Sequence, residues 1–349
     1  MQSAKKILLS ILVPIWQILT RRNLSILMIH GVMDRNSAKS SWIPMRFQLS
    51  PYILDKGLNI LSKKYSFISI TEAIDMLTGV IPIKPYSMVL TFDDGYRNNL
   101  SHALPILSKY NAPAAIFLST GHIYTNEPYW YDRMDYALQH LKCNIQFEFE
   151  SNLYNFPPNN PFELSQSFHN LRYALKSSPS NYLSTLSKIN EILSLLENNS
   201  HGSLYDIFEN DPWTSLLNWD EIKIASKKGI YFGSHTVDHL LLGKVNSQVV
   251  LNQLSISKQH IENNTGQSCQ ILCYPDGDYT PEVIKLAQNC GYKAGLSIRG
   301  GINHPGQKNI FLLSRNSFPN RDNYLSIHAG ASGLTAFFQR IRLNVNKHT

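Results

Sequence analysis

Short apolar runs alternate with longer segments of helical periodicity along most of the chain. The runs at 24–29, 87–92 and 114–118 are almost wholly apolar and predict buried strands. Residues 51–64 repeat apolar side chains at helical spacing, and residues 71–77 predict a short helix with Thr71 as its N-cap. Strands and helices that alternate at this spacing are typical of βαβ units and indicate a parallel sheet.

The alternation is interrupted between residues 127 and 211 and then resumes. This segment is rich in Asn, Ser and aromatic residues and is broken by PPNNP at 157–161, so we predict a largely helical insertion. Successive βα units suit a barrel or a doubly wound sheet, and both place their sites at the C-terminal ends of strands. Downstream, we predict helices at 219–228, 247–263 and 281–289 and strands at 230–233, 270–274 and 294–298.

The N-terminal segment, residues 1–23, combines basic and apolar residues. Lys5 and Lys6 precede a mostly apolar run at 7–19, which is shorter than the roughly 20 apolar residues that cross a membrane. A signal sequence, a helix on the membrane surface through residues 1–22 and a helix packed on the domain all fit this pattern. Secretion, membrane association and cytoplasmic residence therefore stay open.

Composition narrows the classes of partner. Hydrophobic residues make up 43% and charged residues 16% of the chain, which predicts a sizeable core. The net charge of +7 is spread without a dense basic run, so we expect no nucleic-acid partner. None of the four cysteines forms a CxxC pair, and buried thiols are favoured over a metal site for Cys269 and Cys273. The cysteines leave the redox compartment open.

Two adjacent carboxylates, Asp93 and Asp94, follow the strand at 87–92. Burying both requires a cation or a proton, because neighbouring carboxylates repel each other. Gly95 permits the tight turn that would aim both side chains into one cavity. The alternative is a plain Asp-Asp-Gly turn without function.

A pair of histidines, His235 and His239, follows the strand at 230–233. Histidines four residues apart lie on one face of a helical turn, where two nitrogens can converge on a metal ion. Together with an aspartate they would form a three-ligand site open to water and substrate. The alternative is a solvated loop with two unrelated histidines.

Two further candidates also lie at strand ends. Tyr274, Pro275, Asp276 and Gly277 form a rigid loop whose backbone N–H groups could hold an oxyanion, although Pro-Asp-Gly is also a common turn. His30 ends the first strand. A lone histidine in this context is more often a core residue, but its place at a strand end favours function.

Taken together, TFDDG at 91–95, SHTVDH at 234–239 and YPDG at 274–277 resemble the NodB-type polysaccharide deacetylases, carbohydrate esterase family 4. The resemblance covers residues 24–320, with the insertion at 127–211 matched poorly, and leaves 321–349 as a C-terminal tail. It implies an α/β fold, a distorted (β/α) barrel of the polysaccharide deacetylase type.

The resemblance also implies residue roles. Asp93 would be the general base, and Asp94, His235 and His239 would bind a divalent metal, usually zinc, with cobalt, nickel, iron or manganese as alternatives. The metal would polarise an acetamide carbonyl and acidify a water, and the loop at 274–277 would hold the oxyanion. The expected reaction removes N-acetyl groups from a polysaccharide or glycan precursor and releases acetate.

Two departures from the family pattern affect these roles. Cys273 stands where the family usually has an arginine that orients the base, and Arg315 is our candidate replacement. The family's late Leu-x-x-His motif, which supplies the general acid, has no clear match. Relatives acting on poly-N-acetylglucosamine carry that histidine near the N-terminus, so His30 is assigned as the acid, with an ordinary histidine pKa of about 6.5.

Two alternative functions stay open. The same metal site could serve an O-acetyl carbohydrate esterase, and the two departures would also suit a carbohydrate-binding relative that has lost catalysis. The resemblance places the chain in a bacterial cell-envelope glycan context, as a cytoplasmic, a membrane-associated or an exported protein. The oligomeric state is left undetermined.

Overall fold

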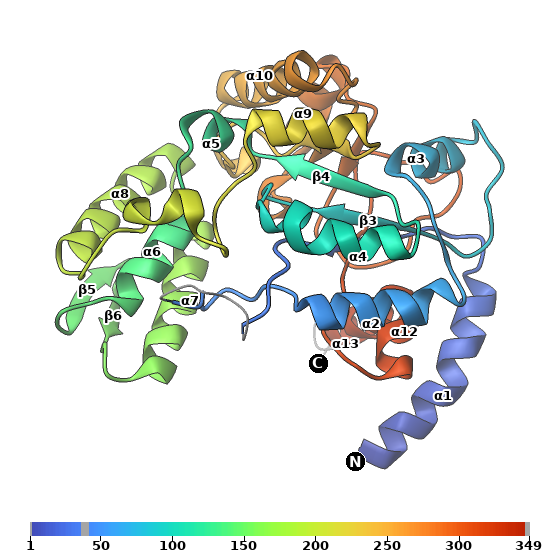
Figure 1. Ribbon diagram of the computed structural model, residues 1–349, viewed down its shortest axis with the longest axis horizontal. Coiled ribbons are helices and arrows are strands. Elements are labelled where there is room, and N and C mark those ends of the chain that lie inside the picture. Colours follow the sequence, from blue (N-terminus) through green and yellow to red (C-terminus); the bar gives the residue numbers. More distant parts are fainter. Residues whose placement is uncertain (1, 36–41, 346–349) are drawn as a thin grey trace.

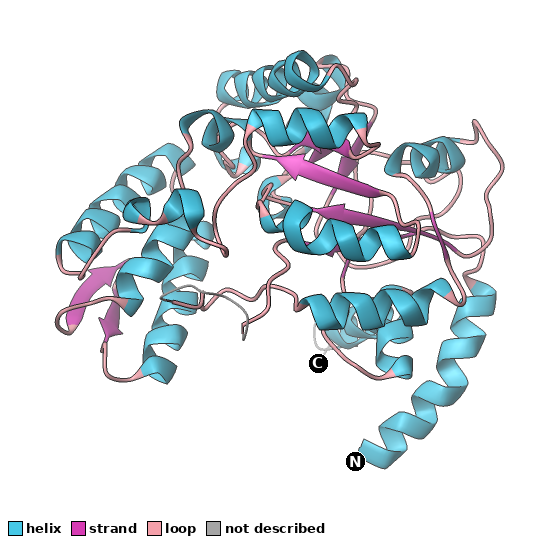
Figure 2. Ribbon diagram, in the orientation of Figure 1, coloured by secondary structure: helices cyan, strands magenta, loops and turns pink. Residues whose placement is uncertain are grey.

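A curled parallel sheet forms the centre of the computed structural model, which describes residues 2–35 and 42–345 (Figures 1 and 2). The strand order is β10-β1-β3-β4-β7-β8-β9, with β2 paired to β3, and every pairing is parallel. Its strands are β1 (Ser25–Ile29), β2 (Ser66–Phe67), β3 (Ser87–Phe92), β4 (Ala114–Leu118), β7 (Tyr231–Ser234), β8 (Ile271–Cys273), β9 (Ala294–Leu296) and β10 (Asn316–Ser317).

The sheet curls towards closure, because a single parallel bridge joins Leu296 of β9 to Leu313, just before β10. This is the distorted barrel that the sequence predicts, and the strands at 87–92 and 114–118 lie at their predicted positions. The covering helices are α2 (Pro51–Ser62), α3 (Ile70–Thr78), α4 (Leu104–Lys109), α5 (Thr120–Thr125), α9 (Trp219–Lys227), α10 (Ser247–Thr265) and α11 (Pro281–Asn289).

Strand side chains alternate between two apolar cores. Ile26, Val89 and Phe117 belong to the core inside the curled sheet. Leu27 and Leu90 belong to the larger core between the sheet and its helices. Because both faces of a parallel sheet are covered, its strands are apolar throughout, as the sequence pattern indicated.

Local signals at helix ends explain most of the element boundaries. Asn218 and Glu221 form a capping box at the start of α9. The predicted cap at Thr71 is wrong, since the Ser69 side chain accepts the hydrogen bond from the Glu72 N–H and α3 begins at Ile70. Both hydroxyl residues suit a cap, and the pattern alone did not separate them.

The insertion forms a lobe with its own core (Figure 1, left). A two-stranded antiparallel hairpin, seen in magenta at the left of Figure 2, lies within an otherwise helical segment. Apolar residues from its strands and helices, among them Phe156, Phe168 and Leu193, are fully buried in that core. The elements of the lobe are α6 (Trp130–Gln139), β5 (Ile145–Phe149), β6 (Asn152–Phe156), α7 (Pro161–Ser177) and α8 (Tyr182–Asn198).

The two chain ends pack against each other. The N-terminal helix α1 (Gln2–Leu19) contacts α12 (Tyr324–Ala331), and Trp16 donates a 2.9 Å hydrogen bond to the carbonyl of Ser332. A second C-terminal helix, α13 (Leu334–Val345), follows, so the segment treated as a tail is helical up to Val345. Residues 346–349 and Met1 lie outside the described residues. Within the described chain, no helix is long and apolar enough to cross a membrane.

We expect Gly233→Ala to destabilise the barrel, because an added Cβ at this point of β7 would clash with the Phe117 ring and lie 3.0 Å from the Ile271 carbonyl. Overpacking of this kind lowers the free energy of unfolding by about 1–3 kcal/mol. Urea denaturation measures it, with Gly202→Ala as the control, since a Cβ there meets nothing closer than 3.6 Å. Equal stability of the two variants would contradict the packing described.

Candidate metal and catalytic site

The predicted site residues converge at the C-terminal ends of four strands. His30 follows β1, the paired aspartates follow β3, His235 follows β7 and Tyr274 follows β8. They surround one cavity of about 410 Å³. Predicted residues that line the cavity are His30, Asp93, Asp94, His235, His239, Tyr274 and Asp276.

Asp94, His235 and His239 form a cluster that fits a metal ion. The Asp94 Oδ1 atom lies 3.6 Å from the Nε2 atoms of both histidines, and all three side chains are buried. Ligand atoms about 2.1 Å from a tetrahedral ion lie about 3.4 Å apart, close to this spacing. Within the described chain, Asp94 Oδ1 accepts no hydrogen bond. A buried carboxylate oxygen without a donor, facing two imidazole nitrogens, is the arrangement that a divalent cation would complete.

The surroundings hold these three ligands in orientation. His235 Nδ1 lies 2.8 Å from the Cys273 carbonyl, which leaves its Nε2 atom directed at Asp94. The other Asp94 oxygen, Oδ2, accepts a hydrogen bond from Tyr131 at 3.3 Å and lies 3.7 Å from an Arg46 nitrogen. Burial, and then the nearby His235, lowers the pKa of His239 to about 3, so its imidazole is neutral as ligation requires.

The two histidines converge through a loop, and the predicted helical turn is wrong. Residues 235–241 are not helical, and Thr236 and His239 have φ values of 69° and 53°. Asp94 and Asp276 also have positive φ, at 73° and 51°. Left-handed backbone at non-glycine residues is strained, and its concentration around one cavity is typical of a functional site.

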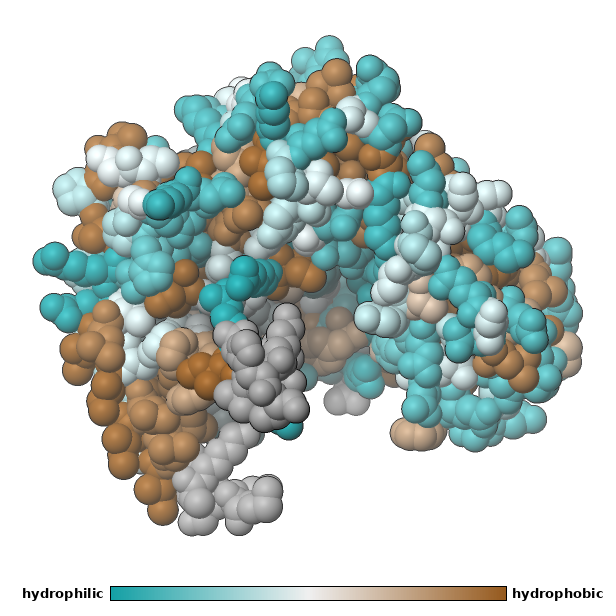
Figure 3. All heavy atoms as spheres, turned by 180° about the vertical axis from the view of Figure 1, so that it is seen from behind, coloured by the Kyte–Doolittle hydropathy of each residue, from teal (hydrophilic) through white to brown (hydrophobic). Residues whose placement is uncertain are grey.

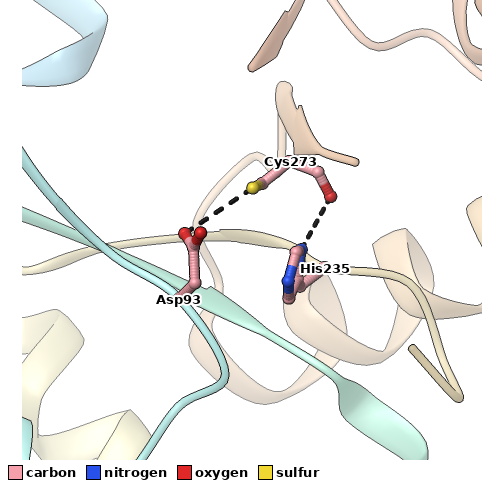
Figure 4. Close-up of side chains that lie close together, drawn as sticks. All are labelled: Asp93, His235 and Cys273. Atoms are coloured by element: carbon pink, nitrogen blue, oxygen red, sulfur yellow. Dashed lines mark hydrogen bonds between the residues drawn. The ribbon is translucent and has the colours of Figure 1, made fainter. Parts of the chain in front are cut away.

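A competing cluster, Asp93, His235 and Cys273, is already occupied by internal interactions (Figure 4). The Cys273 thiol lies 3.6 Å from Asp93 Oδ1, while the His235 ring turns to the Cys273 carbonyl. Burial raises the pKa of the Cys273 thiol well above its ordinary value, so the sulfur stays protonated and is a poor ligand. Cys269 and Cys273 are both buried thiols, as the sequence suggested.

Arg315 pairs with Asp93 through two parallel hydrogen bonds. Its Nη1 and Nη2 atoms lie 2.7 Å and 2.8 Å from the two Asp93 oxygens, and the guanidinium is fully buried. Arg315 also donates to the Cys273 sulfur at 3.0 Å. Burial alone would raise the pKa of Asp93, but the charge and hydrogen bonds of Arg315 outweigh it and hold that pKa far below the usual range. Asp93 is therefore ionised.

His30 lines the cavity, and its backbone is held where β1 ends. Its carbonyl accepts a 2.7 Å hydrogen bond from the Asn99 amide. The expectation of an unperturbed pKa is wrong, because burial lowers the pKa of His30 more than Asp94 and Asp93 raise it. The protonated form of His30 is thus a stronger acid than free histidine.

The loop at 274–277 supplies fewer donors than its sequence suggested. The N–H groups of Tyr274 and Gly277 are bonded to carbonyls of Leu296 and Tyr274, and Pro275 has none. Asp276 is left as the loop residue whose N–H has no acceptor within the described chain, and its side chain lines the cavity. Pro275 and Gly277 shape the turn without lining the cavity.

Several cavity residues carried no signal in the sequence. Arg46 lies 3.1 Å from Asp132 and 3.9 Å above the centre of the Tyr131 ring, close to Asp94. The insertion lobe supplies a basic wall that includes Arg172 and Lys176. These residues belong to no recognisable motif, and only the packing of the lobe on the barrel brings them to the cavity.

We expect Asp94→Asn, His235→Ala and His239→Ala each to lower bound zinc, because each removes one of three ligands. Metal content after zinc loading and gel filtration, measured by atomic emission, reports it directly. Cys273→Ala is the control that separates the two clusters. If Cys273→Ala lost zinc while His239→Ala kept it, the metal site would be assigned to the cluster of Asp93, His235 and Cys273 instead.

Arg315→Met should lower the free energy of unfolding by about 3–5 kcal/mol, because it leaves the Asp93 carboxylate buried without a counter-charge. Arg133→Met is a matched control: Arg133 also binds both oxygens of its partner, Glu197, but both side chains are 20% exposed. Chemical denaturation measures both. The double variant Asp93→Asn with Arg315→Met should recover part of the loss, and additive losses would contradict the coupling.

The sequence profile of the polysaccharide deacetylase family matches residues 82–144 and 183–295, about half of the chain. The gap between the two segments falls in the insertion lobe, and both His30 and Arg315 lie outside the match. A Bacillus subtilis (strain 168) protein named "Putative polysaccharide deacetylase YxkH" is 33% identical over 85 residues. That match covers 24% of this chain and 30% of YxkH, less than a third of the relative.

Solved structures share the fold over most of the chain. The Streptococcus pyogenes deacetylase PplD in complex with acetate aligns with a TM-score of 0.57 at 18% identity, covering 89% of this chain and 98% of PplD. IcaB from Ammonifex degensii aligns at 0.55 and 17% identity, covering 89% and 97%. A de-N-acetylase from Aggregatibacter actinomycetemcomitans aligns at 0.52 and 16%, covering 84% and 94%. By its profile match, and with a fold and motif order that agree, the chain belongs to the polysaccharide deacetylase family.

Proposed function

We propose that the protein is a metal-dependent hydrolase that removes N-acetyl groups from a glycan or glycan precursor and releases acetate. The observation that carries this proposal is that the adjacent residues Asp93 and Asp94 have different surroundings. Among the described residues, no donor reaches the Asp94 oxygen that faces two histidines, while Asp93 is ionised and its charge is balanced by Arg315. One carboxylate is thus suited to hold a cation and its neighbour to accept a proton.

The metal ligands would be Asp94, His235 and His239, and zinc suits this donor set although other divalent ions bind it too. When bound, the ion would supply a Lewis acid that polarises the acetamide carbonyl and makes a water more acidic. Asp93 would accept the proton of the attacking water at one of its oxygens. The low pKa of Asp93 makes it a weak base, so the reaction depends on a water that is already acidified.

His30 is our candidate for the acid that protonates the leaving amine. It lines the same cavity as Asp93 but comes from a different strand, so the two groups can act on different atoms of one substrate. Arg315 would be a positioning residue, which fixes the plane of the Asp93 carboxylate by its two hydrogen bonds. The Asp276 N–H is the loop donor available to a developing oxyanion.

The substrate class follows from the cavity and the family. A cavity of about 410 Å³ suits a small ligand such as one sugar unit. Two solved relatives support the reaction type, since one is named a deacetylase and was solved with acetate, and another is named a de-N-acetylase. An O-acetyl ester would meet the same groups, so the choice between amide and ester rests on assay.

Asp93→Asn should lower acetate release by about 10²–10⁴-fold while zinc stays bound, because it removes the base and keeps the ligands. His30→Ala should lower turnover over a similar range, also with normal zinc. Release of acetate from N-acetylated chito-oligosaccharides, measured with and without a chelator, tests both. His102→Ala is the control, because His102 belongs to the π-helix Asn99–Ala103 and does not line the cavity.

Loss of zinc in Asp93→Asn would assign this residue to the metal instead. Unchanged turnover in His30→Ala would remove His30 from the reaction. If the zinc-loaded protein released acetate from O-acetylated sugars only, the protein would be an O-acetyl esterase and not an N-deacetylase.

A further inference from the structure

Helix α1 has two apolar faces, and only one is covered. Val13 is 1% exposed and packs with residues of α12 and α13, so this face is part of a small core. The other face carries Ile7, Ile11, Ile15 and Ile18, which are 49–60% exposed. A helix that is apolar all round is normally buried all round. Figure 3 shows this face as a brown column at the edge of the molecule.

Helix α13 extends the same apolar surface. Phe337, Phe338 and Ile341 are 43–45% exposed. Neither helix contains an acidic residue, whereas α1 carries Lys6 and α13 carries Arg340 and Arg342. The exposed surface of these two helices, which we call the α1–α13 surface, is therefore both apolar and positively charged.

A groove of about 800 Å³ leads from this surface to the catalytic cavity. Its outer part is lined by Leu8 of α1, Phe338 of α13 and Ala329 of α12. At its inner end it shares four lining residues with the cavity: Met28, His30, Phe47 and Ser317. The side chain assigned as the general acid thus stands where the apolar groove and the polar cavity meet.

We propose that the natural substrate is a lipid-linked N-acetylated sugar, whose sugar enters the cavity while its hydrocarbon chain lies in the groove and the α1–α13 surface rests on the membrane. The proposal builds on the deacetylase function proposed above. A polar cavity joined to an apolar groove matches an amphiphile with a sugar at one end. A soluble polysaccharide would leave the groove and the α1–α13 surface exposed to water.

The charges favour a membrane over a second copy of the chain. Two copies that met through the α1–α13 surface would bring basic residues together without an acidic partner from either helix. Arg321 and Arg342 line the groove, and neither forms an ion pair with a described residue. Anionic lipid headgroups attract such residues and accept an amphipathic helix lying in the interface.

The first experiment compares dodecyl and methyl glycosides of N-acetylglucosamine with the zinc-loaded full chain, below the micelle concentration of the dodecyl compound. Each buried methylene strengthens binding about fourfold, so the dodecyl glycoside should bind at least about tenfold more tightly. Calorimetric titration measures binding and acetate release measures kcat/KM for both. Equal affinity for the two glycosides would overturn the groove assignment.

Matched double variants locate the effect. Leu8→Asn with Phe338→Asn changes two groove residues, whereas Ile11→Asn with Ile341→Asn changes two residues of the same helices with nearly equal exposure that do not line the groove. The first double variant should lose most of the preference for the dodecyl over the methyl glycoside, measured as the ratio of the two affinities. The second double variant should keep this ratio. Loss of the ratio in both variants, or in neither, would contradict a chain bound in the groove.

Sedimentation with vesicles tests the membrane contact. The protein should bind vesicles that contain phosphatidylglycerol more strongly than vesicles of phosphatidylcholine alone, and both double variants should bind less. Absence of vesicle binding would contradict the proposed contact between the α1–α13 surface and the membrane. A dimer detected by light scattering that the variants dissociate would assign the surface to a second copy instead.

The failure of one proposal is distinguishable from the failure of the other. If the dodecyl glycoside bound more tightly but no N-acetylated substrate released acetate, the binding of a hydrocarbon chain in the groove would be supported and the deacetylase function would be contradicted. If acetate were released with the same kcat/KM from both glycosides, the deacetylase function would be supported and the proposal of a lipid-linked substrate would be contradicted.

Discussion

The burial of two adjacent carboxylates at the end of β3 is the constraint on which the site depends. Each must be neutralised separately, because neither can be solvated and they repel each other. Asp93 is neutralised by Arg315 from the far end of the chain. Asp94 has Arg46 at 3.7 Å on one side and two imidazoles on the other, and within the described chain its Oδ1 atom accepts no hydrogen bond. The roles of base and metal ligand proposed for these two residues rest on these different partners.

The fold was largely predictable because its signals are local. Apolar runs bounded by turns located β3 and β4, and helix spacing located α11 at its observed bounds and α10 with an error of two residues at its C-terminal end. Missed features were those that depend on tertiary context. The choice of Ser69 over Thr71 as a cap and the antiparallel hairpin inside the insertion are examples.

The site was predictable where one motif holds the residue and its neighbours. Three motifs at strand ends placed six residues around one cavity, and His30 at the end of β1 adds a seventh, since parallel strands end at the same edge. The loop geometry that brings His235 and His239 together uses left-handed backbone, which spacing alone does not reveal. Arg46 and the basic wall from the insertion come from segments with no motif, so no pattern in the chain could have found them. The lowered pKa of His30 likewise depends on burial that a sequence does not state.

The pairing of Asp93 with Arg315 spans 222 residues, and this has a consequence for biosynthesis. Chains are made from the N-terminus, and β1, β3, β4 and β7 leave the ribosome well before residue 315. Until that arginine emerges, the nascent barrel holds a carboxylate that it cannot bury. We therefore expect a chain that ends before Arg315 to leave the Asp93 carboxylate without its counter-charge and to be less stable than the full chain.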